Sequence, residues 1–405
     1  MLRQATNKQF LYLFLSNFTI LFVGMGLFPL LPVYFSRFGA PQGMIGVFFA
    51  AIYLANAAGP MMVGWLSGRL SRRGMFVTAG LLGVPALLLL GHVQALWQVV
   101  ALTAILWFCG GMDIALVSVF TGLHTRDTNR GKSFSLVSLS IPLGSLLGGA
   151  TIGYLVNHFG YSLMFIVLGI IWMALPVLGL FAIQDTQQKS GAAGVSKLTK
   201  MPARLGARFS VLLLIALLSS VAINMGRLGN SLSMQNLEYS ASSIASSATI
   251  SGLIAIPLTL LIGFLSDRLG HRHFLALTCL LAAGAAVSLG FASALWQFWL
   301  VATLVLVAFC INGAMLSALA TNLLPAPQLG RGLSLVNTAS STGSILSFVS
   351  TGYLLEWLGQ RTLFLMAAIL PILAALVLEF ILHNREAPIP VAIVSESDCL
   401  NQPCN

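Results

Sequence analysis

The chain has 405 residues, of which 58% are hydrophobic and only 7% are charged, and its formal net charge is +10. Soluble domains are about one-quarter charged, so this composition excludes a soluble enzyme, a soluble nucleic-acid-binding protein and a disordered scaffold. It predicts an all-α membrane protein, because the backbone polar groups of a segment in lipid must be paired within that segment.

Apolar segments of about 20 residues, the length that spans a bilayer as a helix, recur along the whole chain. The sequence predicts twelve transmembrane helices, approximately at residues 10–35, 43–66, 75–93, 96–121, 133–157, 160–183, 208–232, 242–265, 273–292, 295–322, 332–356 and 361–382. The predicted domains are an N-terminal six-helix bundle (1–183), a linker (184–207), a C-terminal six-helix bundle (208–383) and a tail (384–405).

The basic residues predict how the chain is oriented in the membrane. If both termini are cytoplasmic, all of the 20 Lys and Arg residues except Arg37, Arg227 and Arg361 lie in the tails, the linker or the turns on the cytoplasmic side. This distribution follows the positive-inside rule. The positive charge is therefore explained by membrane topology and requires no nucleic acid as a partner.

The two predicted bundles carry an internal repeat at a constant offset of about 199 residues. Residues 64–73 match residues 263–272, Ala95-Leu-Trp-Gln98 matches Ala294-Leu-Trp-Gln297, and Gly153-Tyr-Leu155 matches Gly352-Tyr-Leu354. Since each repeat contains six helices, both halves enter the membrane in the same sense. We expect two parallel repeats related by an axis along the membrane normal, with a central cavity between them.

The turns after the second and eighth helices resemble the signature loop of the major facilitator superfamily, G-x-L-x-D-R-x-G-R. The second turn fits well, whereas the first has Gly68 in place of the acid and Ser71 in place of the second glycine. The resemblance implies a secondary transporter for a small-molecule substrate. We expect it to work by alternating access in a bacterial inner membrane, as a monomer without a cofactor.

Finer features resemble the exporters of that superfamily. Pro29 and Pro32 in the first helix are similar to the exporters' P-x-x-P segment, and the fifth helix carries Pro142 close to several glycines. The arginine that antiporters carry in the fourth helix is absent, because Leu106 occupies its place. We predict proton-coupled export of a small organic solute. The alternatives are proton-coupled uptake of a sugar, acid or osmolyte, and a non-transporting sensor or assembly partner.

Asp113 is the one carboxylate well inside a predicted helix, and its repeat mate in the tenth helix is Asn312. A charge at this depth costs several kcal/mol unless it faces a cavity or a partner. We predict that both residues face the cavity and that Asp113 binds substrate or a proton. The alternative is that Asp113 is a neutral, hydrogen-bonded packing residue.

Further candidates for the cavity are Arg227 and three asparagines, Asn17, Asn56 and Asn224. For Arg227 the partner is either an anionic substrate or Glu238, and the alternative is a side chain that extends to the outer interface. For the asparagines we favour hydrogen bonds between helices over substrate contact. The aromatic residues Phe18, Tyr53 and Trp107 are interpreted as lipid-facing or core residues rather than as ligand contacts.

The glycines of the fifth helix form two small-xxx-small pairs, Gly144/Gly148 and Gly149/Gly153, and Gly343/Ser347 is the counterpart in the eleventh helix. This spacing lets helix backbones approach closely. We expect them to pack helices and to permit sliding between the halves.

The two signature loops are expected to act as cytoplasmic latches between the halves. Asp267 would lie near the N-terminus of the fifth helix, where the helix dipole and Lys132 favour a carboxylate. The other latch would be weaker, because Gly68 offers no charge to Arg331. The predicted latch residues are Gly64, Arg69, Arg73, Gly263, Asp267, Arg268, Gly270, Arg272, Lys132 and Arg331. The alternative is that the arginines only set the topology.

Motifs for catalysis or ATP binding are absent from the sequence, and Cys399 with Cys404 is too weak a pattern to predict a metal site. The protein is therefore predicted not to be an enzyme. Glu356 and Glu379 are expected to be solvated at the two membrane interfaces.

Overall fold

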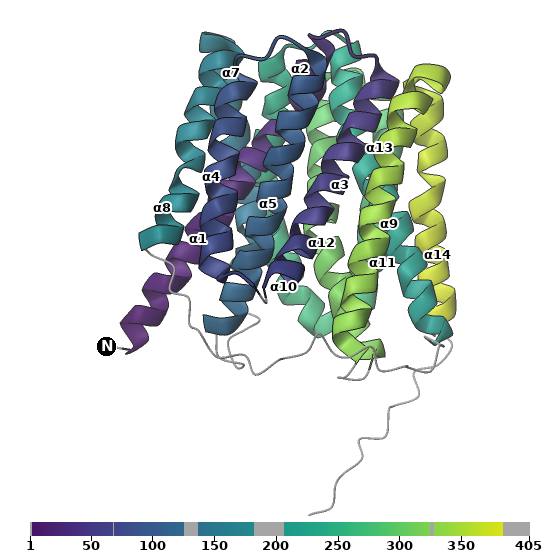
Figure 1. Cartoon of the computed structure of the whole chain (residues 1–405). Helices are drawn as coiled ribbons and strands as arrows, with labels where there is room; N and C mark the ends of the chain where they lie inside the picture. The colour runs from purple at the N-terminus through teal and green to yellow at the C-terminus, as the bar shows by residue number, and fades with distance from the viewer. Residues whose placement is uncertain (1, 68, 125–136, 182–205, 325–327, 384–405) are drawn as a thin grey trace, which may run out of the picture.

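The computed structural model is a bundle of long helices that run roughly side by side (Figure 1). The structure describes residues 2–67, 69–124, 137–181, 206–324 and 328–383, and these ranges contain helices but no strand. The helices are α1 (Leu2–Leu27), α2 (Leu31–Ser36), α3 (Gln42–Leu66), α4 (Arg72–Leu90), α5 (Leu96–His124), α7 (Ser140–Trp172), α8 (Ala174–Phe181), α9 (Ala207–Asn236), α10 (Ala241–Leu269), α11 (His271–Gly290), α12 (Leu295–Leu323), α13 (Leu329–Ala367) and α14 (Ile369–His383).

Ten helical segments of the described residues are long and apolar enough to cross a membrane. Two of them, 140–181 and 329–379, are 42 and 51 residues long, about twice the length that a bilayer requires. Each contains a glycine with non-helical backbone angles, Gly160 (φ 77°) and Gly359 (φ 74°). Glycine adopts positive φ without steric cost, so the chain bends at the two places where the sequence predicts a boundary between helices.

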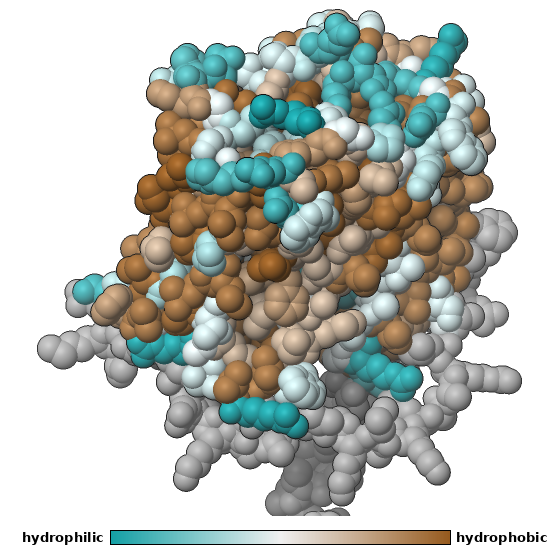
Figure 2. Space-filling model, turned by 45° about the horizontal axis from the view of Figure 1, so that its top comes forward, coloured by the Kyte–Doolittle hydropathy of each residue, from teal (hydrophilic) through white to brown (hydrophobic). Residues whose placement is uncertain are grey.

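The bundle has two polar ends and an apolar middle. The end at which α1 begins and α14 ends is the lower face in Figure 1, and the end that holds the turns before α3 and α10 is the upper face. Figure 2 shows hydrophilic residues gathered on the upper face and a broad hydrophobic belt below them. Exposed Leu, Phe and Trp side chains on this belt are expected where the solvent is lipid.

The N-terminal helices (α1–α8) and the C-terminal helices (α9–α14) meet along two pairs. In one pair α3 packs on α13, and a Cβ atom on Gly46 would lie 3.0 Å from the Cα atom of Gly352. In the other pair α7 packs on α10, and a Cβ atom on Gly153 would lie 3.0 Å from the Cβ atom of Ala245. At the offset of 199 residues, Gly46 corresponds to Ala245 and Gly153 corresponds to Gly352, so the two contacts are equivalent. Small residues therefore bring the backbones of both pairs together.

Other local contacts also recur at the same offset. The side chain of Gln98 accepts the backbone N–H groups of residues 94 and 95 and so caps α5, and Gln297 caps α12 in the same way through residues 293 and 294. The bends at Gly160 and Gly359 are a further pair at this offset. The two sets of helices therefore share details of geometry as well as sequence.

Candidate functional site

A cavity of about 370 Å³ lies between the N-terminal and C-terminal helices, and we call it the central cavity. Most of its wall comes from α1, α3, α5, both ends of α7 and the residues just before α7, and the C-terminal helices contribute Arg227 of α9 and Phe309 of α12. It is mainly apolar, and a few polar side chains enter it, among them Asn17, Tyr53, Asn56 and Arg227. A concave apolar site with a few polar groups is the usual form of a small-molecule site.

Arg227 of α9 is the one charged side chain that the described residues place on this wall. Its Cζ atom lies 3.9 Å from the ring centroid of Phe28 and 4.6 Å from that of Phe309. Its Nη1 donates to the Tyr53 hydroxyl at 2.9 Å, and its Nη2 lies 3.7 Å from the sulfur of Met25. Stacking on aromatic faces stabilises a guanidinium, so aromatic rings hold Arg227 in the cavity.

Arg227 has no carboxylate within 4.0 Å in the described part of the chain. Glu238, one of the two partners that the sequence suggests, lies beyond the end of α9, in the turn that leads to α10. The remaining option that the sequence leaves open is an anionic ligand.

Aromatic side chains form much of the cavity wall and its upper end. Tyr53 and Trp107 line the cavity, although their sequence pattern suggested packing alone. Above them, fully buried Phe348 of α13 packs against Tyr53 with ring centroids 4.5 Å apart, and against Phe49 at 5.6 Å. These rings separate the cavity from the upper face.

Three asparagines form hydrogen bonds between helices, as the sequence predicts. Asn17 donates to the Val137 carbonyl at 3.1 Å, and Asn56 donates to the Trp107 carbonyl at 3.1 Å. Asn224 donates to the Ser344 hydroxyl at 2.9 Å. Asn17 and Asn56 also line the central cavity, whereas Asn224 lies behind Arg227 and only approaches its Nη1 at 3.5 Å.

Asp113 and Asn312 lie away from the central cavity wall. Asp113 is fully buried in α5, and neither of its carboxyl oxygens has a hydrogen-bond partner among the described residues. Asn312 of α12 is 7% exposed, and its Oδ1 atom also lacks a partner there. An unpartnered buried carboxyl is costly and unusual, so Asp113 remains a candidate for a proton rather than for direct substrate contact.

A second cavity of about 470 Å³ continues from the central cavity toward the lower face. The two cavities share Ser138 and Ile141, and the second extends to Phe264 and His271, where α10 ends and α11 begins. At the upper face the Gln42 and Asn236 side chains are hydrogen-bonded to each other.

The backbone N–H of Gly43 also donates to Glu356 at 3.2 Å, so α3 is tied to α13 at the upper face. The structure is thus closed above the central cavity and hollowed below it. Glu356 is exposed, as the sequence suggested, and it also takes part in this closure.

The predicted glycine pairs of α7 lie on two different faces. A Cβ atom on Gly144 or Gly148 would lie within 2.7 Å of the backbone of α1. A Cβ atom on Gly149 would lie 2.8 Å from the Thr249 backbone nitrogen of α10, and Gly153 faces the same helix. Gly343 packs against α9. One pair thus packs helices within the N-terminal set, and the other packs the two sets against each other.

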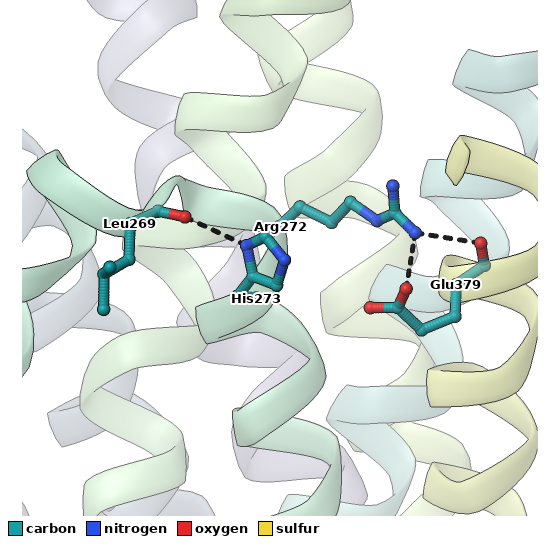
Figure 3. Close-up of polar contacts among 4 residues, drawn as sticks. All are labelled: Leu269, Arg272, His273 and Glu379. Atoms are coloured by element: carbon teal, nitrogen blue, oxygen red, sulfur yellow. Dashed lines mark hydrogen bonds and ion pairs between the residues drawn. The ribbon is translucent and has the colours of Figure 1, made fainter. Parts of the chain in front are cut away.

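Two predicted latch residues instead contact the last helix of their own set. Arg272 donates to the Glu379 carbonyl at 2.9 Å and to its carboxylate Oε2 at 2.5 Å (Figure 3). Arg73 donates through Nε to the Gly179 carbonyl at 2.8 Å and also bonds the Leu180 carbonyl. Cations near helix C-termini are favoured by the helix dipole, so both arginines stabilise the lower end of a terminal helix. Glu379 is exposed, as the sequence suggested, and it is also the ion-pair partner of Arg272.

The other residues of the signature loops lie at the surface. Arg69 stacks on Trp65 at 4.8 Å, and Arg268 stacks on Phe264 at 4.5 Å. Gly64 and Gly263 have open space where a Cβ atom would stand, and Arg331 is exposed. Gly270 has φ 90°. Gly68, Lys132 and the side chain of Asp267 lie outside the described residues, so the predicted Asp267–Lys132 latch stays a prediction.

Comparisons with known proteins agree with this architecture. The sequence pattern described as Major Facilitator Superfamily matches residues 13–234 and 209–397. Multidrug resistance protein MdtG of Salmonella arizonae is 25% identical over 307 residues, which cover 72% of this chain and 74% of that protein, and MdtG of Salmonella paratyphi C is equally similar.

Among solved structures, the nucleoside transporter NupG has a TM-score of 0.76 at 14% identity, with 91% of this chain and 98% of that chain covered. A bacterial homologue of the lysosomal transporter Spinster has a TM-score of 0.73 at 12% identity, with 95% and 99% covered. That structure is described as inward-facing and unoccupied. At these identities the likeness concerns the fold alone.

Proposed function

The chain belongs to the Major Facilitator Superfamily and is a membrane transporter rather than an enzyme, and from this premise we propose that it exports a small organic molecule in exchange for protons. Its relatives named as multidrug resistance proteins favour export over uptake. The proposed mechanism is alternating access, in which the central cavity opens to one side of the membrane and then to the other.

One observation carries this proposal: the central cavity lies between two sets of helices, is closed at the upper face and continues to the lower face. A carrier needs a site that two bundles can expose in turn, and this arrangement provides one of the two end states. A fixed receptor would have no need for glycine-lined contacts at both interfaces between the sets.

We further propose that the protein has twelve transmembrane helices in two parallel six-helix repeats. Division of the two longest helical segments at Gly160 and Gly359 gives this number, and the contacts that recur at an offset of 199 residues support the symmetry. The proposed cytoplasmic side is the lower face, where Arg69, Arg72, Arg73, Arg268, Arg272 and Arg331 lie. The described state would then be inward-facing.

For the coupling ion we propose the proton, with Asp113 as its site. Transfer of an unpaired carboxylate charge into the membrane interior costs several kcal/mol. Since Asp113 is fully buried and has no partner in the described residues, a change in its protonation would change the stability of this state. That dependence is what couples a proton to a conformational change.

The test is flux in proteoliposomes with an imposed pH gradient. The panel consists of ethidium, naphthalene-2-carboxylate, 2-naphthamide and glucose. We expect a proton gradient to drive at least one aromatic probe against its own gradient, in the direction opposite to the protons, and an ionophore that collapses the pH gradient to stop it. Movement of glucose together with protons would support uptake instead, and movement of no probe under any gradient would contradict transport.

A further inference from the structure

The central cavity has an unbalanced charge. Arg227 brings one positive charge to its wall, and the described residues bring no negative charge to it. The nearest buried acid of α5, Asp113, does not line the cavity. A charge in the membrane interior is costly unless it faces a cavity or a partner. Arg227 faces the cavity, so a bound ligand can supply the negative charge that the described wall residues lack.

The geometry of Arg227 leaves donors available for such a partner. Its Nη1 is shared between Tyr53 and the more distant Asn224, and among the described residues the acceptor near its Nη2 is the sulfur of Met25, a weak acceptor. The Tyr53 hydroxyl accepts from Arg227, so its own proton is free to be donated. A planar guanidinium and a neighbouring hydroxyl together match an oxyanion such as a carboxylate.

The rest of the wall suits an apolar body attached to that anion. Phe28 and Phe309 both pack against the guanidinium, and Trp107 with Ile20 and Leu106 lines the same cavity. These residues would contact aromatic or aliphatic carbon. An organic cation of the same size would meet the same apolar walls but would be repelled by Arg227.

Building on the proposed transport function, we propose that the central cavity selects amphipathic organic anions, with the anionic group on Arg227 and Tyr53 and the apolar body between the aromatic rings. Arg227 is then the residue that determines ligand charge. It also links the two sets of helices through the bound anion, because Arg227 belongs to α9 and Tyr53 to α3.

The test is equilibrium binding to the purified full-length protein in lipid nanodiscs. Three naphthalene probes of nearly equal size differ in charge: naphthalene-2-carboxylate, 2-naphthamide and 2-naphthylmethylammonium. We expect the carboxylate to bind at least about tenfold more tightly than the ammonium, as a charge-assisted hydrogen bond predicts. Arg227→Gln should remove that preference, Arg227→Lys should keep part of it, and Tyr53→Phe should weaken carboxylate binding alone.

A matched control is Arg361→Gln. Arg361 also stacks on an aromatic ring, 4.9 Å from the centroid of Phe291, but it does not line the central cavity. We expect this variant to bind the three probes as the original protein does. Retained binding of 2-naphthamide by Arg227→Gln shows that the cavity of that variant is intact.

The inference is overturned if the ammonium binds as tightly as the carboxylate, if the carboxylate does not bind, or if Arg227→Gln leaves its affinity unchanged. Flux of the same probes separates this result from the proposed function. Transport of the amide or the ammonium without the carboxylate overturns the inference and leaves the transport function standing. If no probe is transported, the transport function fails, and the binding arms still decide the charge preference.

Discussion

Arg227 and Asp113, two ionisable side chains inside the helix bundle, lie in different surroundings. Arg227 is half-buried on the wall of the central cavity and contacts three aromatic side chains. Asp113 is fully buried within α5 and lacks a hydrogen-bond partner among the described residues. Arg227 can therefore contact a ligand in the cavity. Asp113 cannot, but a charge on its buried carboxyl would change the stability of the described conformation.

We therefore predict that Asp113→Asn separates binding from coupling. The asparagine side chain does not ionise, so transport driven by a pH gradient should be abolished. Substrate affinity should change by less than about threefold, which corresponds to under 1 kcal/mol. Flux and equilibrium binding measure the two effects.

The matched control for Asp113→Asn is Thr103→Val on the same helix. It removes a buried, unpartnered polar atom that carries no exchangeable charge, and it should leave coupling intact. Normal pH-driven flux in Asp113→Asn would remove Asp113 from the mechanism.

Single residues also show what the sequence could and could not predict. The asparagine hydrogen bonds follow from polar residues placed in apolar helices, and they are confirmed. The departure of Ser71 from the signature glycine also has a local reason. Ser71 caps α4 with an ordinary φ of −66°, whereas Gly270 has φ 90°, which favours glycine. The Phe309 contact to Arg227 could not be predicted, because it joins α12 to α9 through tertiary packing alone.

At the scale of elements, α7 packs on different helices with its two glycine pairs. Gly144 and Gly148 lie against α1, while Gly149 and Gly153 lie against α10. The Ser145 hydroxyl adds a hydrogen bond to the Ala248 carbonyl at 2.8 Å across the second contact. The residues on the α10 side hold the two sets of helices together in the state that is closed at the upper face.

We predict different effects for leucine at neighbouring positions of α7. Gly149→Leu should separate α7 from α10 and lower the population of this closed state, because added methylenes in a tight contact cost about 1–3 kcal/mol. Spin-label distances across the upper face should lengthen.

Gly148→Leu is the comparison for Gly149→Leu. It should lower thermal stability instead, since its side chain would clash with the Phe22 carbonyl of α1. Equal distances in Gly149→Leu and the original protein would contradict the assignment of that contact.

The positions of the helices were largely predictable from the lengths of the apolar segments, but two contacts between helix ends were not. The turns at residues 37–41 and 237–240 lie close to the predicted boundaries, and the bends at Gly160 and Gly359 coincide with them. By contrast, Arg73 and Arg272 bind the ends of α8 and α14, each 106 to 107 residues away in sequence. These partners could not be predicted, because they come together only through the tertiary packing of the six helices in each set.

For the whole molecule, the two cavities extend from the middle of the bundle toward the lower face among the described residues. The central cavity and the cavity below it share Ser138 and Ile141, and buried Phe348 packs on Tyr53 of the cavity wall. The sequence predicted a cavity between repeats, but the side that is closed depends on which contacts form, and composition carries no information about this.

We predict that Ser138→Cys, in a protein without its native cysteines, is labelled by a membrane-impermeant thiol reagent from the lower side in the absence of a gradient. A proton gradient with substrate should add labelling from the upper side. Inverted and right-side-out vesicles distinguish the two sides.

Thr303→Cys, buried among helices, should stay unreactive from either side and serves as the control. Labelling of Ser138→Cys from one side alone under every condition would contradict alternating access.

The lone positive charge on the wall of the central cavity also has an electrical consequence. With a monoanion bound, the charge of Arg227 is compensated, whereas in the proposed proton-carrying return step Asp113 is neutral and the charge of Arg227 is uncovered. A transmembrane voltage acts on one charge with about 2.3 kcal/mol per 100 mV across the full bilayer. Voltage should therefore change the rate of the return step, in which the charge of Arg227 has no bound anion to compensate it.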